Sequence, residues 1–294
     1  MAAEQLENVQ MMYFEDFELG RTYVSGPRQV TPEDLELFTR LSGDDNPIHT
    51  GSPDPAGASG AREESLFERP VLQGAFGVAI FTGFVRQLGL DGAALALLDT
   101  NWKYVAPIYV HDTITCEITV TRKRLSGTAG RGVVHRHVVL RNQDNDVLQQ
   151  GTSAFLIRTR GTVDVPACLQ FGTADWGQSL IPHLEDNRDF SAAVASYDGT
   201  IGLAVGNEEV HFRIYRGRII EAARRSLLGA DFTLTADEYT WTQLILGSTN
   251  DFMKRAMLGQ FSVRGSGAEY LRMTKVLVQL VDAARAAARE ENAR

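Results

Sequence analysis

The sequence predicts an α+β protein, and three patterns in the chain carry this prediction. Residues 74–85 are apolar on every side, as in a helix that is buried all round. Residues 113–122 alternate strictly between apolar and polar side chains, which indicates a half-buried antiparallel strand. Strand patterns also occupy 101–105, 132–140 and 147–157. One buried helix and several antiparallel strands together predict a sheet wrapped around that helix.

The composition is that of an ordinary globular protein with two domains. The chain has 294 residues, of which 44% are hydrophobic and 22% charged, so each half is long enough to bury its own core. The net charge of -8 argues against nucleic acid as the main partner, because phosphate binding requires a clustered excess of Lys and Arg. A local basic pocket for a phosphorylated ligand is still compatible with this charge.

The cysteines and the N-terminus bear on the cellular compartment. Cys116 and Cys168 have no metal-ligand spacing and do not suggest a disulfide-stapled secreted fold. Residues 1–19 carry acidic side chains where a secretion signal would need a basic start and an apolar run. The longest uncharged apolar run, 70–85, is shorter than the roughly 20 residues of a membrane-spanning helix. We therefore expect a cytoplasmic protein without a membrane span.

A short helix precedes the buried one. After strand-like patterns in 13–30, residues 31–34 (Thr-Pro-Glu-Asp) combine a hydroxyl cap, proline at the first helical position and acids in the first turn. Gly43 ends this helix. The turn 44–49 follows, and the small residues and prolines of 50–66 predict a loop.

The rest of the chain reads as a second α+β domain. Residues 161–188 lose periodicity and gather glycines and prolines, so we place a linker there, between domains 1–160 and 189–294. Beyond it we expect strands at 200–205, 209–215, 218–223, 231–235 and 261–264, and helices at 237–246, 251–258 and 268–289.

Asp44 and His49 are the candidate catalytic residues. A carboxylate and an imidazole on one turn can flank a single water, one group accepting its proton and the other orienting it or returning a proton. Histidine suits this role because its ordinary pKa of about 6.5 lies near neutral pH. By spacing alone, the pair also fits a turn carboxylate that caps backbone amides beside a surface histidine.

Three ordered motifs favour the catalytic interpretation. They are Ser42-Gly-Asp-x-Asn-Pro-Ile-His49, then Phe67-Glu-Arg-Pro-Val-Leu72 before Gly74, and Trp102-Lys-Tyr-x-x-Pro-Ile-x-x-x-Asp112 before an alternating strand. Together they resemble the MaoC-like, (R)-specific enoyl-CoA hydratases of the hot-dog fold. The resemblance covers about 13–157.

The resemblance implies a hydro-lyase that hydrates a 2-enoyl-CoA, or dehydrates a 3-hydroxyacyl thioester, without a cofactor. Asp44 and His49 match the family's catalytic pair, which activates water, and Asn46 matches a position that shapes the turn. Gly74 matches the glycine that opens the central helix, whose backbone N–H would bind the thioester oxygen. An unpaired donor at a helix N-terminus suits the developing oxyanion.

The chain departs from the family pattern in two places. The family usually has histidine before the helix-opening glycine, and this chain has Gln73, so the helix entry differs while the backbone donor is retained. The loop 50–66 is also longer than usual, and we expect it to act as a lid or to admit an unusual acyl group. Because the family buries its exposed sheet surface by pairing, we expect a homodimer with sites near the interface.

The second domain resembles the sterol-carrier-protein lipid-binding module over about 189–288. The matching residues are Tyr197-Asp-Gly-Thr200, Ala230-Asp-Phe-Thr-Leu-Thr235, a helix with Trp241, and Met253–Met257 followed by Gly259-Gln-Phe-Ser-Val-Arg-Gly265. The resemblance implies a sheet and helices around an apolar tunnel for fatty acyl chains or lipids. The alternative is a domain that has lost its tunnel and serves packing or dimerisation.

Other groups carry weaker interpretations. His135 and His137 share one face of a strand without a nearby third ligand, so we expect no metal site. The arginines between 213 and 225 either hold a CoA phosphate or form a solvated hairpin edge. Two alternative functions stay open, namely a hot-dog acyl-CoA thioesterase and a non-catalytic acyl or lipid carrier in a biosynthetic assembly.

Overall fold

The computed structural model describes residues 11–51, 67 and 69–293. Contacts divide the chain into two compact units. The N-terminal unit contains 21–120 and 130–160 together with the residues up to Phe17, and the C-terminal unit contains 161–294 with the short segments 18–20 and 121–129. The predicted loop 50–66 lies, from residue 52 onwards, outside the described residues.

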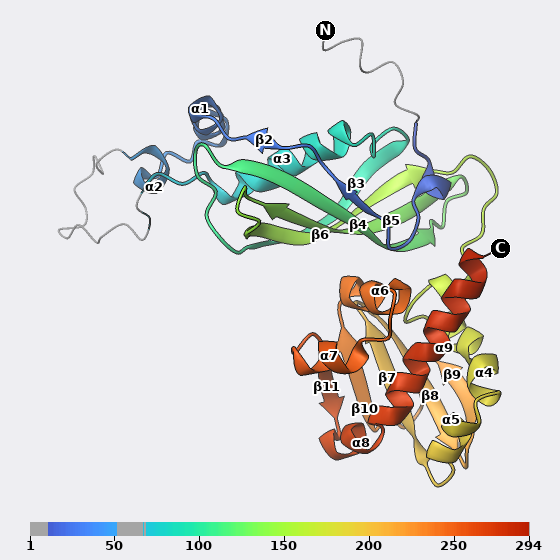
Figure 1. Ribbon diagram of the computed structural model, residues 1–294. Coiled ribbons are helices and arrows are strands. Elements are labelled where there is room, and N and C mark those ends of the chain that lie inside the picture. Colours follow the sequence, from blue (N-terminus) through green and yellow to red (C-terminus); the bar gives the residue numbers. More distant parts are fainter. Residues whose placement is uncertain (1–10, 52–66, 68, 294) are drawn as a thin grey trace. The chain divides into compact units, whose positions relative to one another are not determined.

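The N-terminal unit is an antiparallel sheet lying along one central helix, α3 (Figure 1). The strand order is β1-β4-β5-β6-β3, and β2 also pairs with β4. This is the arrangement expected of a hot-dog domain. Its elements are η2 (Phe14–Asp16), β1 (Thr22–Val24), β2 (Arg28–Gln29), α1 (Pro32–Ser42), α2 (Pro47–Thr50), α3 (Gly74–Gln87), β3 (Ala94–Tyr104), β4 (Thr113–Leu125), β5 (Arg131–Arg141) and β6 (Val147–Arg158).

Local sequence signals explain where the first helix begins and ends. Thr31 Oγ1 accepts a hydrogen bond from Asp34 N at 3.1 Å, and Asp34 Oδ2 accepts one from Thr31 N at 2.9 Å, which completes a capping box. Gly43 adopts a left-handed conformation with φ 72° and ends the helix. The predicted start and end of α1 are confirmed.

Helix α3 is more open than its sequence predicts. Its bulky side chains Phe76, Phe81 and Phe84 are buried. The expectation that the helix is buried all round is wrong, because one face is exposed: Gly74, Ala75, Ala79, Thr82 and Gly83. These residues are small, so they leave room along the helix instead of filling it.

Strand β3 is longer than predicted and forms an edge of the sheet. It begins at Ala94, whereas the sequence indicated 101–105, and it pairs with β6 on one side. Register shifts between Ala94 and Ala96 and between Leu97 and Asp99 break the regular alternation that would have revealed its first half. Leu97 and Leu98 on this strand are half exposed, at 54% and 50%.

The C-terminal unit is a five-stranded sheet in the order β11-β10-β7-β8-β9, in which β10 runs parallel to β7. Large apolar side chains of the strands and helices share one core, so the helices cover one face of the sheet. The elements are η3 (Ala167–Leu169), α4 (Ala174–Glu185), α5 (Arg188–Ala193), β7 (Asp198–Val205), β8 (Glu208–Tyr215), β9 (Arg218–Ala223), β10 (Phe232–Ala236), α6 (Glu238–Leu246), α7 (Phe252–Met257), β11 (Ser262–Gly265), α8 (Gly267–Arg272) and α9 (Thr274–Asn292).

Two segments of this unit differ from the sequence-based expectation. Residues 174–185, inside the expected linker 161–188, form α4, and its Trp176, Leu180 and Leu184 belong to the core. Their spacing of four residues is a helical signal that the surrounding glycines and prolines obscured. The single helix expected at 268–289 is divided at Met273 into α8 and α9.

The connection from β9 to β10 crosses the sheet. The strand register pairs Ala223 of β9 with His211 of β8. His211 is paired in turn with Gly202 of β7, and Gly202 with Thr233 of β10, so these four residues lie in one row across the sheet. The chain therefore leaves β9 and returns at β10 three strand spacings away, about 14 Å at the usual strand separation. Ile201, Phe212 and Phe232, the neighbours of these residues, belong to the core. Because side chains alternate between faces along a strand, the side chains of His211 and Thr233 lie on the face of the sheet away from that core.

None of the helices in the described part of the chain combines the length and the apolar character that a membrane span requires.

Candidate active site

The turn after α1 brings Asp44 and His49 together. His49 lies on the short helix α2, whose start is capped by Asn46, because Asn46 Oδ1 accepts a hydrogen bond from Ile48 N at 3.1 Å. The Nε2 atom of His49 lies 3.4 Å from Asp44 Oδ2. The His49 side chain is only 8% exposed, whereas the Asp44 side chain is 48% exposed. The surface-histidine alternative therefore does not describe this residue.

The segment before α3 fixes the orientation of the imidazole. Val71 N donates to Ile48 O at 3.1 Å, and Val71 O lies 2.7 Å from His49 Nδ1. Since a carbonyl only accepts, Nδ1 carries the hydrogen and donates it to Val71 O. In the neutral ring, Nε2 is then an acceptor that faces a second acceptor, Asp44 Oδ2. A water molecule could donate one hydrogen to each of these two atoms.

Gln73 connects α1, the Asp44 turn and the start of α3. Its Nε2 donates to Thr39 Oγ1 and to the carbonyl oxygen of Asp44, both at 2.9 Å. The side chain is 3% exposed, and its Oε1 has no hydrogen-bond partner among the described residues. Gln73 therefore holds the backbone of Asp44 in place. Its buried amide oxygen retains acceptor capacity.

The start of α3 points unpaired backbone donors outwards. Gly74 is the first residue of the helix, and Gln73 provides no side-chain cap. No hydrogen bond from Gly74 N to another described residue is formed, as expected for the first turn of a helix. Gly74 is exposed, and Tyr104 lies beside it, since a Cβ placed at Gly74 would lie 3.0 Å from Tyr104 Cε1. A ligand oxygen can approach this N–H.

Behind this helix start, Gln149 and Trp102 support the backbone. Gln149 Nε2 donates to Gly74 O at 3.1 Å, and Gln149 Oε1 accepts from Trp102 Nε1 at 2.7 Å. Gly77 makes room for the amide, because a Cβ at position 77 would lie 1.9 Å from Gln149 Oε1. The sequence analysis missed Gln149, Thr39 and the Val71 carbonyl. Only Gly77 carried a signal, as a glycine inside a helix needs a packing reason.

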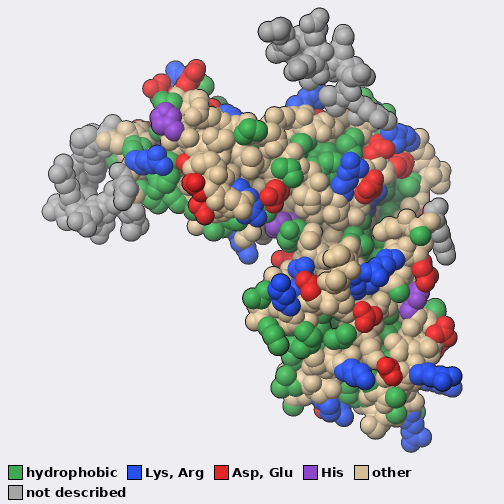
Figure 2. Space-filling view, in the orientation of Figure 1, with side chains coloured by type: hydrophobic (Ala, Val, Ile, Leu, Met, Phe, Trp, Pro, Cys, Tyr) green, Lys and Arg blue, Asp and Glu red, His purple; other side chains and the backbone are tan. Residues whose placement is uncertain are grey.

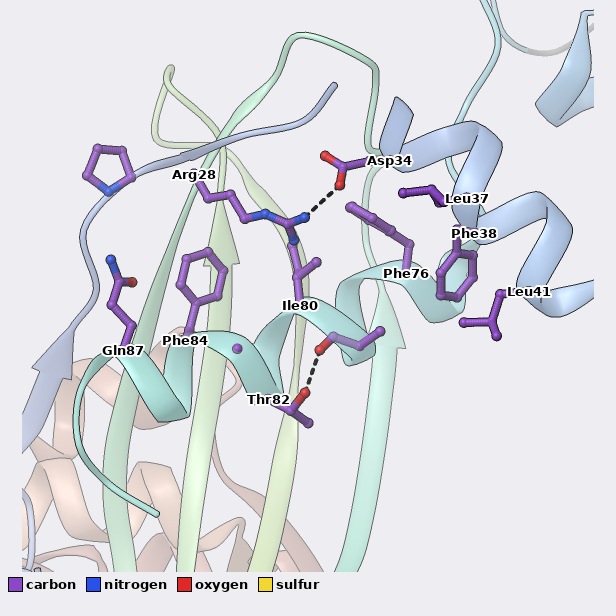
Figure 3. Close-up of a pocket in the computed structure, with 13 residues that line it drawn as sticks. Arg28, Asp34, Leu37, Phe38, Leu41, Phe76, Ile80, Thr82, Phe84 and Gln87 are labelled. Atoms are coloured by element: carbon purple, nitrogen blue, oxygen red, sulfur yellow. Dashed lines mark hydrogen bonds and ion pairs between the residues drawn. The ribbon is translucent and has the colours of Figure 1, made fainter. Parts of the chain in front are cut away.

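An open pocket of about 660 Å³ lies along the exposed face of α3. Figure 3 shows Phe76, Ile80 and Phe84 of α3 on one side and Leu37, Phe38 and Leu41 of α1 on the other. Arg28 closes one part of the rim, where its Nη2 lies 2.7 Å from Asp34 Oδ1. Asp44, His49 and Gly74 do not line this pocket, but Phe38 precedes Thr39, the partner of Gln73. The wall of the pocket is mostly apolar.

A second cavity of about 370 Å³ lies near the C-terminal half of α3 and the first half of β3. Arg136 lines it, and its guanidinium lies over the rings of Phe81 and Phe155, at 4.9 and 4.4 Å from their centroids. Burial lowers the pKa of Arg136 to about 10. Among the described residues, no three His, Cys, Asp or Glu side chains are grouped so that they could hold a metal ion.

The fold and the site of the N-terminal unit together define a class of protein. It is a hot-dog domain in which an aspartate, a histidine and the uncapped start of the central helix lie close together. Comparison with known proteins finds a family match within this unit. Residues 16–141 match the family model described as MaoC like domain.

Individual relatives are similar at modest identity. The (R)-specific enoyl-CoA hydratase of Aeromonas caviae is 33% identical over 91 residues, 31% of this chain and 62% of that protein. The beta-methylmalyl-CoA dehydratase of Chloroflexus aurantiacus is 28% identical over 151 residues, 50% of this chain and 40% of that protein. A solved MaoC-like dehydratase from Rhodospirillum rubrum is 22% identical with a TM-score of 0.41, and the match covers 51% of this chain and 99% of that one. The chain thus spans less than two thirds of the length of the two curated relatives.

Proposed function

We propose that the N-terminal unit is a hydro-lyase that hydrates 2-enoyl-CoA, or dehydrates a 3-hydroxyacyl thioester, with (R) stereochemistry and without a cofactor. The observation that carries this proposal is the pair of acceptors, His49 Nε2 and Asp44 Oδ2, 3.4 Å apart. A water beside the pair can donate one hydrogen to each of these two atoms. The named relatives with related activities support the reaction class.

In the proposed reaction, His49 and Asp44 orient water and take up one of its protons as its oxygen adds to the β-carbon of the enoyl group. A proton is then delivered to the α-carbon of the resulting enolate, which completes the hydration. The Val71 carbonyl keeps the hydrogen of the imidazole on Nδ1, so proton transfer on His49 takes place at Nε2. Gly74 N–H stabilises the negative charge that develops on the thioester oxygen. The same groups in the reverse direction return a proton to the leaving hydroxide.

The acyl chain would occupy the pocket beside α3. Its lining residues start at Phe76, two positions after Gly74, and reach Gln87. From Gly74 to Gln87 this is a path of about 20 Å along the helix at 1.5 Å per residue. The apolar wall suits an acyl chain, whereas a CoA phosphate would require basic groups. Asn46 shapes the turn as the cap of α2, and Gln73 positions Asp44.

The proposal is tested by incubating the full-length protein with crotonyl-CoA and a longer enoyl-CoA and determining the chirality of the product. We expect (R)-3-hydroxyacyl-CoA from the wild type. We expect losses of about 10²- to 10⁴-fold for Asp44→Ala and His49→Ala, the usual range for general acid–base groups. Circular dichroism verifies that both variants fold. Wild-type activity in both variants would refute the site, and release of free CoA without a hydroxyacyl product would favour a thioesterase instead.

The homodimer and the cytoplasmic location belong to the same proposal. The edge strand β3 supports a dimer, because Leu97 and Leu98 are half exposed and the strand's outer side is unpaired in the described chain. Cys116 and Cys168 form no disulfide, which is compatible with a reducing compartment. Light scattering of the purified protein measures the mass. A monomeric mass would contradict the dimer.

For the C-terminal unit we propose a sterol-carrier-like lipid-binding domain that comprises the predicted range 189–294 together with α4, whose Trp176, Leu180 and Leu184 share its core. Its support is the α+β order of the elements, with helices on one face of a mixed sheet. A fluorescent fatty acid should bind to the full-length protein and be displaced by palmitate. If no binding is observed, the domain serves packing or assembly instead.

A further inference from the structure

Two adjacent leucines in the C-terminal unit are fully exposed. Leu227 and Leu228 have relative exposures of 106% and 98%, the highest of the large apolar side chains in the described residues. They lie in the connection between β9 and β10, which crosses the sheet. Single exposed leucines are common on protein surfaces, whereas neighbouring ones at full exposure form a small apolar protrusion that indicates a contact with another apolar phase.

A tight turn holds the two side chains outwards. Gly229 N donates to Ser226 O at 3.1 Å, so residues 226–229 form a β-turn with the leucines at its two central positions. Ser226 Oγ also donates to Gly229 O at 2.6 Å. Gly229 has φ +78°, a conformation that glycine adopts readily. The leucines therefore form the tip of the turn.

Buried polar contacts anchor this turn to the sheet. Ser226 N donates to Nδ1 of His211, which is 5% exposed. Because Nδ1 accepts, Nε2 carries the hydrogen and donates to Glu209 Oε1 at 3.0 Å. Glu209 Oε2 in turn accepts from Arg264 Nη2 at 2.9 Å. The tip is thus held in one conformation before any partner arrives, which lowers the entropy cost of binding.

Two cations lie just before this turn, separated from the leucines by Ser226. Arg224 and Arg225 are exposed, and neither forms an ion pair with another described residue. On the face shown in Figure 2, basic and acidic side chains are mixed. Attraction to an anionic surface is therefore a local property of this connection and not of the whole chain, whose net charge is -8.

We propose that residues 224–229 dock the protein on a membrane surface that contains anionic phospholipids. Leu227 and Leu228 enter the boundary between headgroups and acyl chains, and Arg224 and Arg225 bind the anionic headgroups. A stable protein partner would need about 800 Å² of surface per side, far more than two leucines provide. A bilayer accepts such a small protrusion and supplies both an apolar phase and negative charge. Binding is weak and reversible, since few groups take part. The inference does not depend on the proposed hydratase activity.

The test is sedimentation of the full-length protein with vesicles of phosphatidylcholine alone and of phosphatidylcholine mixed with phosphatidylserine. We expect binding to the mixed vesicles that decreases with salt, because headgroup attraction is screened. The double variant Leu227→Ser/Leu228→Ser should bind at least about tenfold more weakly. Arg224→Gln/Arg225→Gln should lose about fivefold per arginine on the mixed vesicles.

A matched control variant replaces a second pair of adjacent, exposed apolar side chains in the C-terminal unit. Met257 and Leu258 are also adjacent and exposed, at 82% and 65%. Of the two cations before them, Lys254 and Arg255, the second is paired with Asp251, so its charge is balanced. Met257→Ser/Leu258→Ser should bind vesicles like the wild type. The proposal is overturned if the wild type binds neither vesicle, if the leucine variant binds as well as the wild type, or if the control pair loses as much. A fall in molecular mass for the leucine variant, without vesicle binding by the wild type, would assign the turn to self-association.

Discussion

The start of α3 in the N-terminal unit differs from the starts of α4 and α6 in the C-terminal unit. The difference lies in whether a side chain of the preceding segment accepts a hydrogen bond from the first backbone N–H groups of the helix. Every helix begins with backbone N–H groups that lack partners inside the helix. Thr173 Oγ1 accepts from Trp176 N at 3.1 Å, and Asp237 Oδ1 accepts from Thr240 N at 2.7 Å, so α4 and α6 are capped by their own chain. Gln73 gives α3 no such cap.

This difference indicates where the molecule can receive a ligand. A capped start stabilises the fold, and its donors are occupied. The start of α3 is exposed at Gly74, and the side chain that would have capped it binds Thr39 and the Asp44 carbonyl instead. The unused donors then lie next to Asp44 and His49.

Trp176→Ala should cost about 3 to 5 kcal/mol of unfolding free energy, the usual loss for a large core aromatic. Trp176 is fully buried and lies 6.5 Å from Trp241, centroid to centroid. Urea unfolding followed by far-UV circular dichroism measures the change, and activity of the folded variant should persist. A loss below about 1 kcal/mol would show that α4 behaves as the linker expected from sequence.

Gly74→Pro tests the donor at the start of α3. Proline lacks the N–H but is favoured at the first helical position, and Gln73 already has a compatible extended conformation, with φ -56° and ψ 139°. We expect hydration of crotonyl-CoA to fall about 10²- to 10³-fold, as for loss of one oxyanion donor.

Gly74→Ala is the control for this substitution. It adds the same Cβ beside Tyr104 and keeps the N–H, so most of the activity should remain. Equal losses in both variants would attribute the effect to crowding of Tyr104 and remove Gly74 N–H from the mechanism.

Asp237→Ala should show the smallest effect of the three. Removing the cap of α6 is expected to cost about 1 kcal/mol of unfolding free energy, because the amide of Thr240 loses its acceptor. Asp175→Ala, which removes an acid from the first turn of α4 but leaves the Thr173 cap intact, should cost only a few tenths. If the two variants are equally stable, side-chain capping does not distinguish these helix starts from that of α3.

Much of the fold follows from local patterns. The capping box at Thr31, the left-handed Gly43, the alternation on β4 and the glycine that opens α3 all appear where the sequence places them. Helix α4 and the first half of β3 were missed, because tertiary packing and register shifts override the local signal there.

The candidate site was predictable in part. Asp44 and His49 were named from their spacing on one turn, and Gly74, Asn46 and Gln73 from the resemblance, but their catalytic roles stay proposals. Two further groups that orient the site, the Val71 carbonyl and Gln149, could not be found from sequence. The partner of His49 Nδ1 is a backbone carbonyl that any residue at position 71 would supply, and Gln149 reaches Gly74 from a strand 75 positions away.

The close approach of Gly77 to Gln149 restricts which positions of α3 can be substituted without disturbing the Gly74 donor. Any side chain at position 77 displaces the amide that holds both Gly74 and Trp102, so a substitution there disturbs the donor although Gly77 does not line the pocket. The α1 side carries no such restriction. Leu37 and Leu41 line the pocket with 48% and 84% of their surface exposed. Substitutions at these two positions should therefore alter chain-length selectivity at little cost in stability, which makes α1 the natural starting point for directed evolution.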